Sequence, residues 1–124
     1  MVAVFDLDVV NDKKLDDAIS LADEKGVTIM VSNLSFEVWL LMHLTDVSRL
    51  HSQDDYEEML SRHIGHRYRK SEGLKAHINS ESIFDAITRG MKRLKDPDPR
   101  ICKATYNSTT LWKLVDEVIS DVHR

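Results

Sequence analysis

The stretch from Val27 to Leu44, VTIMVSNLSFEVWLLMHL, constrains the fold of this chain more than any other part of it. It opens with a short run of apolar and β-branched residues, crosses a polar turn, and continues as an apolar segment whose only charged residue is Glu37. We interpret it as a buried strand that leads through the turn into a buried helix. The polar residues keep each apolar run below the roughly 20 residues that a membrane span requires, so we expect no membrane segment.

A second apolar run, from Val2 to Phe5, predicts a first strand, and it ends in an Asp-Leu-Asp sequence at positions 6 to 8. Apolar residues at helical spacing follow, after a cap at Asn11 or Asp12, and Gly26 is expected to end that helix. Strand, helix and strand in about 30 residues predict a βαβ unit, whose two strands lie parallel.

The pattern of apolar residues after Leu44 predicts a mainly helical structure. Helix caps are expected at Ser52, at Asn79 or Ser80, and at Asn107 or Ser108. A turn or extended loop is predicted at residues 96–99, which contain two prolines, and a short helical turn at residues 73–78.

These elements predict an α/β fold in a single domain, residues 1–124. A partial βαβ unit with a small parallel sheet and its buried helix would occupy residues 1–44, and a mainly helical part residues 45–124. Two strands alone do not make a stable sheet, so either the pattern misses a strand or another chain completes the sheet.

Three carboxylates are candidates for chemistry. The carboxyl ends of parallel strands open at the same edge of a sheet, which would bring Asp6 and Asp8 toward Glu37. Carboxylate oxygens suit Mg²⁺ or Mn²⁺, and Asp6 with Asp8 would be the metal ligands if the chain bends after the strand. The alternative is that two aspartates end a strand in solvent and that the helix N-terminus stabilises Glu37. An apolar setting nevertheless predicts a partner for the Glu37 charge.

A basic connector offers a second candidate site. Arg67, Arg69 and Lys70 surround Tyr68, so the cations could bind phosphates while the ring stacks on a base. The alternative is a solvated connector, in keeping with a formal net charge of −4. That charge argues against a general nucleic-acid coat, although a local basic patch can still bind nucleic acid.

Cys102 is the single cysteine, so no internal disulfide can form. The first residues lack the pattern of a signal peptide. Both observations predict a cytoplasmic protein.

Three segments together, VAVFDLD, IMVSNLSFEVWLLMHL and YNSTTLWKLVDEV, resemble the RloB-like (AbiLii-like) proteins of prokaryotic phage-defence loci. The resemblance covers nearly the whole chain and implies a branch of the Toprim fold, in which a D-x-D and an earlier glutamate bind Mg²⁺ for phosphodiester chemistry. It also implies an ATPase partner, because members are often encoded beside one. The positions that match the family's D-x-D and S-N-P-x-F-E motifs are Asp6, Asp8, Ser32, Asn33, Phe36 and Glu37.

The sequence departs from the family pattern at three places. Leu34 stands where the family has proline, Ser108 replaces the proline of an N-P-S-T pattern, and the E-G-x-x-T-E motif has no counterpart before Met1. We therefore expect a metal-dependent nuclease domain that is incomplete or inactive alone and is completed by a second copy, by another chain or by a longer reading frame. The alternative is a noncatalytic protein-binding module, such as a phage-encoded inhibitor or decoy of a defence complex.

Overall fold

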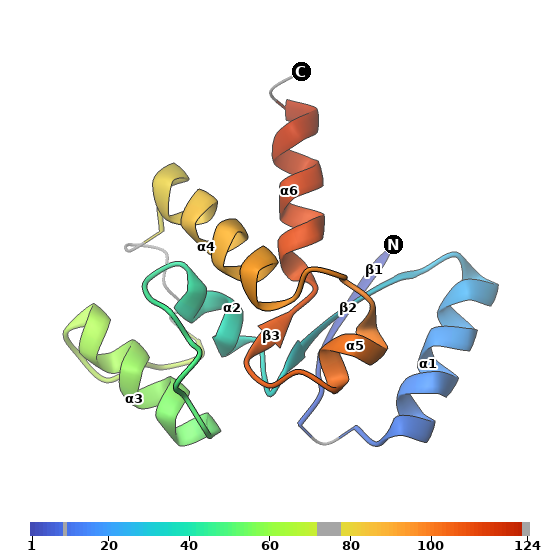
Figure 1. Ribbon diagram of the computed structural model, residues 1–124, viewed down its shortest axis with the longest axis horizontal. Helices are drawn as coiled ribbons and strands as arrows, with labels where there is room; N and C mark the ends of the chain where they lie inside the picture. Colours follow the sequence, from blue (N-terminus) through green and yellow to red (C-terminus); the bar gives the residue numbers. More distant parts are fainter. Residues whose placement is uncertain (9, 72–77, 123–124) are drawn as a thin grey trace.

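The computed structural model describes the chain except residues 9, 72–77 and 123–124. The predicted helical turn at residues 73–78 lies almost wholly outside the described residues. The described elements, in chain order, are β1 (Val2–Asp6), α1 (Asp12–Lys25), β2 (Thr28–Asn33), α2 (Glu37–Met42), α3 (Gln53–Ile64), α4 (Ser80–Arg93), α5 (Pro99–Lys103), β3 (Ser108–Thr109) and α6 (Leu111–Val122) (Figure 1).

The helix ends follow from local sequence. Asn11, Ser52 and Asn79 each cap a helix through a side-chain oxygen that accepts a backbone N–H of the first turn, as predicted. Gly26 and Gly65 end α1 and α3 in the left-handed conformation, with φ of 68° and 81°.

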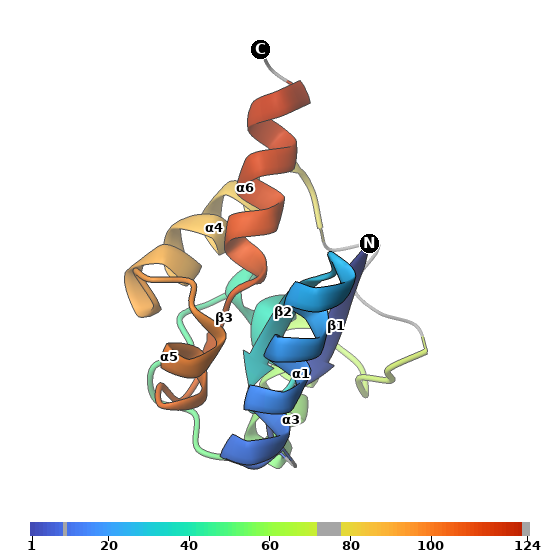
Figure 2. The ribbon, with the colours of Figure 1, turned by 90° about the vertical axis from the view of Figure 1, so that its right-hand side faces the viewer.

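The predicted βαβ unit is confirmed. β1 pairs with β2 in parallel, with Val2 opposite Thr28 and Asp6 opposite Ser32. α1 connects the two strands and lies beside them (Figures 1 and 2). The fold is therefore of the α/β class, and a mainly helical part follows the βαβ unit, as the sequence predicts.

The structure adds a strand that the sequence pattern misses. β3 pairs antiparallel with the other side of β2, so the sheet has the order β1-β2-β3 and is mixed rather than wholly parallel. The prediction of a helix cap at Asn107 or Ser108 is wrong, because Ser108 lies in β3 and α6 begins only at Leu111. A two-residue strand is too short to show any periodicity.

A second correction concerns the segment with two prolines. The predicted turn or loop is confirmed for residues 96–98, but Pro99 begins the short helix α5, which the sequence pattern misses. Asp98 accepts a hydrogen bond from the N–H of Arg100, and Pro99 occupies the first helical turn. Proline is tolerated there because those N–H groups have no partner inside the helix.

The core lies in two parts. In the larger part α2 packs against α3 and α4, α6 packs against α4, and all six residues of α2 are buried. The smaller part lies between α1, the sheet and α5, around Leu7, Leu15 and Val31. No described helix is long and apolar enough to cross a membrane.

The contact between α4 and α6 depends on the absence of a side chain at Gly90. A Cβ atom added to Gly90 would lie 2.7 Å from the Cβ of Trp112, closer than real Cβ contacts come. Trp112 cannot easily withdraw, because its indole N–H donates to the carbonyl of Leu94 at 3.0 Å.

We therefore predict that Gly90→Ala lowers the free energy of unfolding by about 1–3 kcal/mol, although alanine favours helix formation. Denaturant unfolding followed by circular dichroism measures this change. Thr88→Ala, at an exposed position of the same helix, is the control and should stay within about 0.5 kcal/mol of the unsubstituted protein. A Gly90→Ala protein of equal or greater stability would contradict the packing described here.

Candidate functional site: an acidic edge and a buried glutamate

The turn between β2 and α2 is held by side chains from distant parts of the chain. The amide nitrogen of Asn33 donates to the carbonyls of Cys102 and Lys103, at 3.1 and 3.0 Å, which ties α5 to the end of β2. The next peptide bond, Asn33–Leu34, is cis. The Leu34 N–H donates to the hydroxyl of Tyr56 on α3 at 3.2 Å. The turn therefore has a defined position relative to both α3 and α5.

Asn107 connects this turn to the loop before α3. It is buried and has a φ of 57°, a conformation that asparagine tolerates better than most residues. Its amide nitrogen donates to the carbonyls of Val47 and Leu50, at 2.9 and 2.6 Å, and its oxygen accepts from the Tyr56 hydroxyl. The asparagine of the YNSTT segment thus has a structural role in place of the predicted cap.

Asp6 reaches the start of α2 from the end of β1. Its Oδ1 accepts the backbone N–H of Phe36 at 2.8 Å. Because Phe36 directly precedes Glu37, the structure brings Asp6 and the Glu37 backbone to the same end of the sheet. First-turn N–H groups lack partners within a helix, so the carboxylate satisfies one of them.

Asp8 lies beside the same turn but is exposed. After β1 the chain continues along the turn, with the Leu7 N–H donating to Ser32 and the Asp8 N–H donating to Leu34, at 2.9 and 3.1 Å. We call Asp6, Asp8 and Glu37 the acidic edge. Within the described residues no group of three or more His, Cys, Asp or Glu side chains is arranged to hold a metal ion, so these three do not form such a cluster.

Glu37 is 1% exposed and has the partner that the sequence predicts. Its Oε1 accepts from the side-chain amide of Gln53 at 2.9 Å and lies 3.5 Å from the ammonium of Lys70. Gln53 is itself held by the hydroxyl of Ser35. The second carboxylate oxygen, Oε2, is buried without a hydrogen-bond partner in the structure, which leaves one acceptor available.

The basic connector is arranged differently from the prediction. Tyr68 is 6% exposed and belongs to the core, so its ring is not available to stack on a base. Burial, and then the nearby Glu37 carboxylate, raise the pKa of the Tyr68 phenol to about 12. Lys70 faces Glu37 at the distance given above, while Arg67 and Arg69 are exposed on the same connector.

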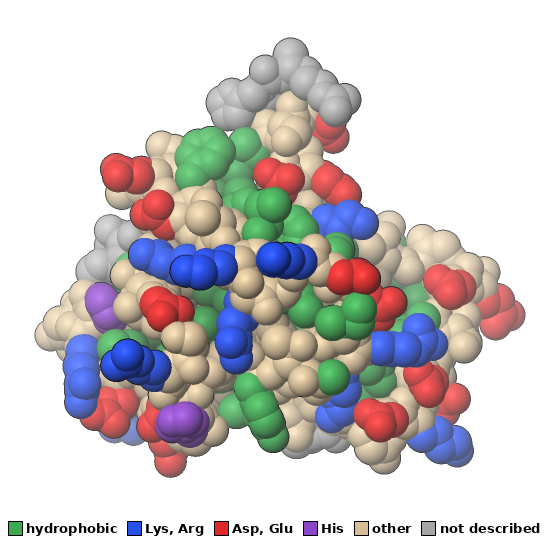
Figure 3. All heavy atoms as spheres, in the orientation of Figure 1, with side chains coloured by type: hydrophobic (Ala, Val, Ile, Leu, Met, Phe, Trp, Pro, Cys, Tyr) green, Lys and Arg blue, Asp and Glu red, His purple; other side chains and the backbone are tan. Residues whose placement is uncertain are grey.

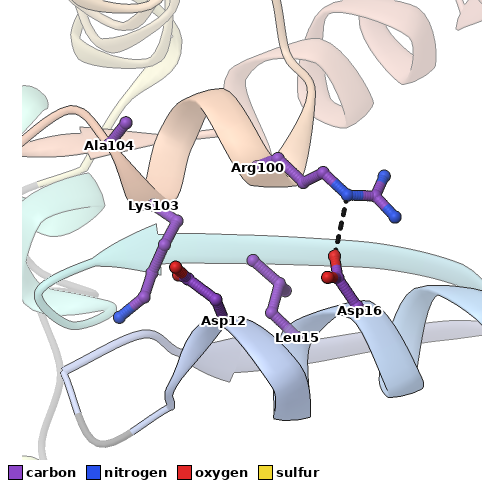
Figure 4. Close-up of a pocket in the computed structure, with 6 residues that line it drawn as sticks. All are labelled: Asp12, Leu15, Asp16, Arg100, Lys103 and Ala104. Atoms are coloured by element: carbon purple, nitrogen blue, oxygen red, sulfur yellow. Dashed lines mark hydrogen bonds and ion pairs between the residues drawn. The ribbon is translucent and has the colours of Figure 1, made fainter.

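A cavity of about 460 Å³ lies between α1 and α5, next to the end of β1. Its charged residues come as two acids, Asp12 and Asp16, and two bases, Arg100 and Lys103 (Figure 4). Arg100 bridges the two helices through an ion pair with Asp16 at 2.9 Å. The formal charges of these four side chains sum to zero, so the cavity has no net electrostatic attraction for a cation or an anion.

Lys103 connects this cavity to the acidic edge. Its ammonium donates to the carbonyl of Leu7, between Asp6 and Asp8, at 3.4 Å. Sequence reasoning missed both Lys103 and Gln53, because each reaches the site only through a contact that is distant in the sequence.

Comparisons with known proteins add a family match. The family described as RloB-like protein matches residues 1–118, a span that includes every residue of the acidic edge. No curated protein and no solved structure matches the chain.

We predict that Glu37→Gln raises the free energy of unfolding by about 1 kcal/mol, because it removes a buried charge with an unpaired oxygen and keeps an acceptor for Gln53. Denaturant unfolding at pH 7 measures the change. The same substitution should lower the pKa of Tyr68, which ultraviolet titration of the phenol would detect.

Glu57→Gln provides the matched control, since Glu57 is exposed on α3 and its substitution should change stability by no more than about 0.5 kcal/mol. If Glu37→Gln instead lowers the free energy of unfolding by more than about 2 kcal/mol, the carboxylate stabilises the fold.

Proposed function

Because this chain belongs to the RloB-like protein family, we propose that it is a phage-defence protein of a Mg²⁺- or Mn²⁺-dependent nuclease lineage related to the Toprim fold. The observation that carries this proposal is the 2.8 Å hydrogen bond from Phe36 to Asp6, which keeps one aspartate of the D-x-D at the same end of the sheet as Glu37. The reducing cytoplasm is the proposed location, in keeping with a free, buried Cys102.

The carboxylates of Asp6 and Asp8 are ligands of the kind that a hard divalent cation prefers. Asp6 and Asp8 would hold the ion, since Mg²⁺ commonly takes one or two carboxylates from the protein and keeps several waters. The bound ion would supply stabilisation of the negative charge that develops on a phosphoryl oxygen. The unpaired, buried Oε2 of Glu37 supports a further role for this residue, since an acceptor without a partner is costly unless a ligand uses it.

Neighbouring cations would orient a nucleic-acid phosphate. The Lys103 ammonium donates to the carbonyl of Leu7, the residue between Asp6 and Asp8 in the sequence. It therefore adds positive charge at the acidic edge. Arg67 and Arg69 are exposed on the connector that carries Lys70, and they are proposed as more distant phosphate contacts. Lys70 acts chiefly on Glu37, at 3.5 Å. An ATPase partner, which the family resemblance implies, would act together with this domain.

We expect saturable Mn²⁺ binding by the isolated chain, measured by titration calorimetry, without DNA or RNA cleavage until a further chain completes the site. Asp6→Asn and Asp8→Asn should each weaken binding by about tenfold, because one anionic ligand is lost. Asparagine at position 6 retains an acceptor for the Phe36 N–H, so the fold should persist.

Asp23→Asn is the control, since Asp23 is exposed on α1 and should leave Mn²⁺ affinity unchanged. Absence of saturable binding in the unsubstituted protein, or equal affinity in all three variants, would overturn the metal-binding proposal.

The edge of the sheet favours a second candidate function, a noncatalytic protein-binding module such as an inhibitor or decoy of a defence complex. Within the described residues β1 pairs with β2 alone, which leaves its other edge open to a further strand. Ala3 and Phe5 line a cavity together with α1, whereas Val2 and Val4, on the opposite face, are 43% and 48% exposed. Apolar exposure on an open edge supports completion of the sheet by a second copy or by another protein.

We predict that the protein self-associates through β1 and that Val4→Lys shifts it to a monomer, because charge on an edge strand opposes strand addition. Light scattering with size-exclusion chromatography measures the mass, and circular dichroism checks that the fold is kept. Met91→Lys, at an exposed apolar position of α4, should leave the mass unchanged. A monomeric unsubstituted protein would count against self-association.

A further inference from the structure

A cavity that shares no residue with the acidic edge carries an excess of positive charge. It has a volume of about 310 Å³ and lies between the end of α4 and the loop before α3. Its lining residues are Asp46, Val47, Ser48, Arg89, Lys92 and Arg93. Lys and Arg side chains gather across the middle of the molecular face around the end of α4 (Figure 3). None of the lining residues belongs to the acidic edge.

The two arginines are fixed by neutral partners. Arg89 donates to the carbonyl of Met42 at 2.6 Å, and Arg93 donates twice to the carbonyl of Tyr106, at 3.0 and 2.8 Å. Each guanidinium has five N–H donors, so these bonds orient the groups and leave donors available. Carbonyl partners do not cancel the positive charge, as carboxylates would.

The acidic residue of the cavity is engaged by its own loop. The Asp46 carboxylate accepts the N–H of Ser48 at 3.1 Å and its hydroxyl at 2.8 Å. These hydrogen bonds, with the charge of Lys92 as a smaller cause, lower the pKa of Asp46. Three cations and one carboxylate give the lining a formal charge of +2, in a chain whose net charge is −4.

We propose that this cavity binds a phosphate monoester or inorganic phosphate, through the guanidinium groups of Arg89 and Arg93 and the ammonium of Lys92. Such a group carries a charge of about −1.5 to −2 at pH 7, which complements the lining, whereas a phosphodiester carries about half as much. Guanidinium forks match the geometry of phosphate oxygens. The volume is at the lower limit of small-molecule pockets, so it accepts a phosphate group with the rest of its carrier outside.

The ligand has two plausible sources, a free phosphate or nucleotide and the phosphorylated end of a nucleic acid. Titration calorimetry of the full chain with inorganic phosphate, AMP, and one oligonucleotide with either a 5′-phosphate or a 5′-hydroxyl distinguishes them. Saturable binding of phosphate and AMP alone assigns the first source. Tighter binding of the 5′-phosphorylated oligonucleotide than of its 5′-hydroxyl form assigns the second.

Lys92→Gln tests the site, because Lys92 is exposed and its substitution should leave the fold intact, as circular dichroism would verify. We expect about tenfold weaker phosphate binding, since a charge-assisted contact is lost. Lys95→Gln makes the same charge change three residues away at an exposed position outside the cavity lining, and it should bind as the unsubstituted protein does.

Two results would overturn the proposal. One is no binding of phosphate or AMP by the unsubstituted protein together with equal affinity for the two oligonucleotide forms, and the other is equal weakening in Lys92→Gln and Lys95→Gln. Loss of Mn²⁺ binding at the acidic edge would leave the proposal untouched, because the two sites share no residue.

Discussion

The polar turn that joins β2 to α2 depends on hydrogen bonds that converge from β1, α3, α5 and the loop before β3. Asp6 reaches it from β1 and Tyr56 from α3, Asn33 at the end of β2 reaches α5, and Asn107 links Tyr56 to the loop before α3. A turn buried at this depth leaves polar backbone groups that must find partners, and these side chains supply them. The position of α2 at the centre of the core follows from the way its first residues are held.

The same turn introduces a charge into the core. Glu37 starts a helix whose residues are all buried, and its carboxylate has one neutral hydrogen-bond donor, one more distant ammonium and an oxygen without a partner. A core selected for stability alone would favour an apolar or fully paired group at this position. The cost of Glu37 is the physical basis of the proposal that a ligand uses this carboxylate.

Charges of one sign predominate at each of two places in the molecule. Carboxylates lie at the carboxyl end of the parallel strands, whereas arginines and a lysine surround a cavity between α4 and the loop at residues 46–48. The cavity between α1 and α5 stands between these extremes, with two acids and two bases. The outer strand β1 adds exposed apolar side chains, since Val2 and Val4 are 43% and 48% exposed. The acidic edge, the basic cavity and this strand edge share no residue.

The sequence by itself determined the elements whose signals are local: the β1-α1-β2 unit, the caps of α1, α3 and α4, and the presence of Asp6 and Glu37 at one end of the sheet. Their periodicity and capping residues act within a few positions along the chain. Only the tertiary structure decided the two-residue β3, the burial of Tyr68, the bond from Gln53 to Glu37 and the clustering of Arg89 and Arg93 beside Asp46. Each of these depends on contacts between residues far apart in the chain, and no local propensity reports which distant segments pack together.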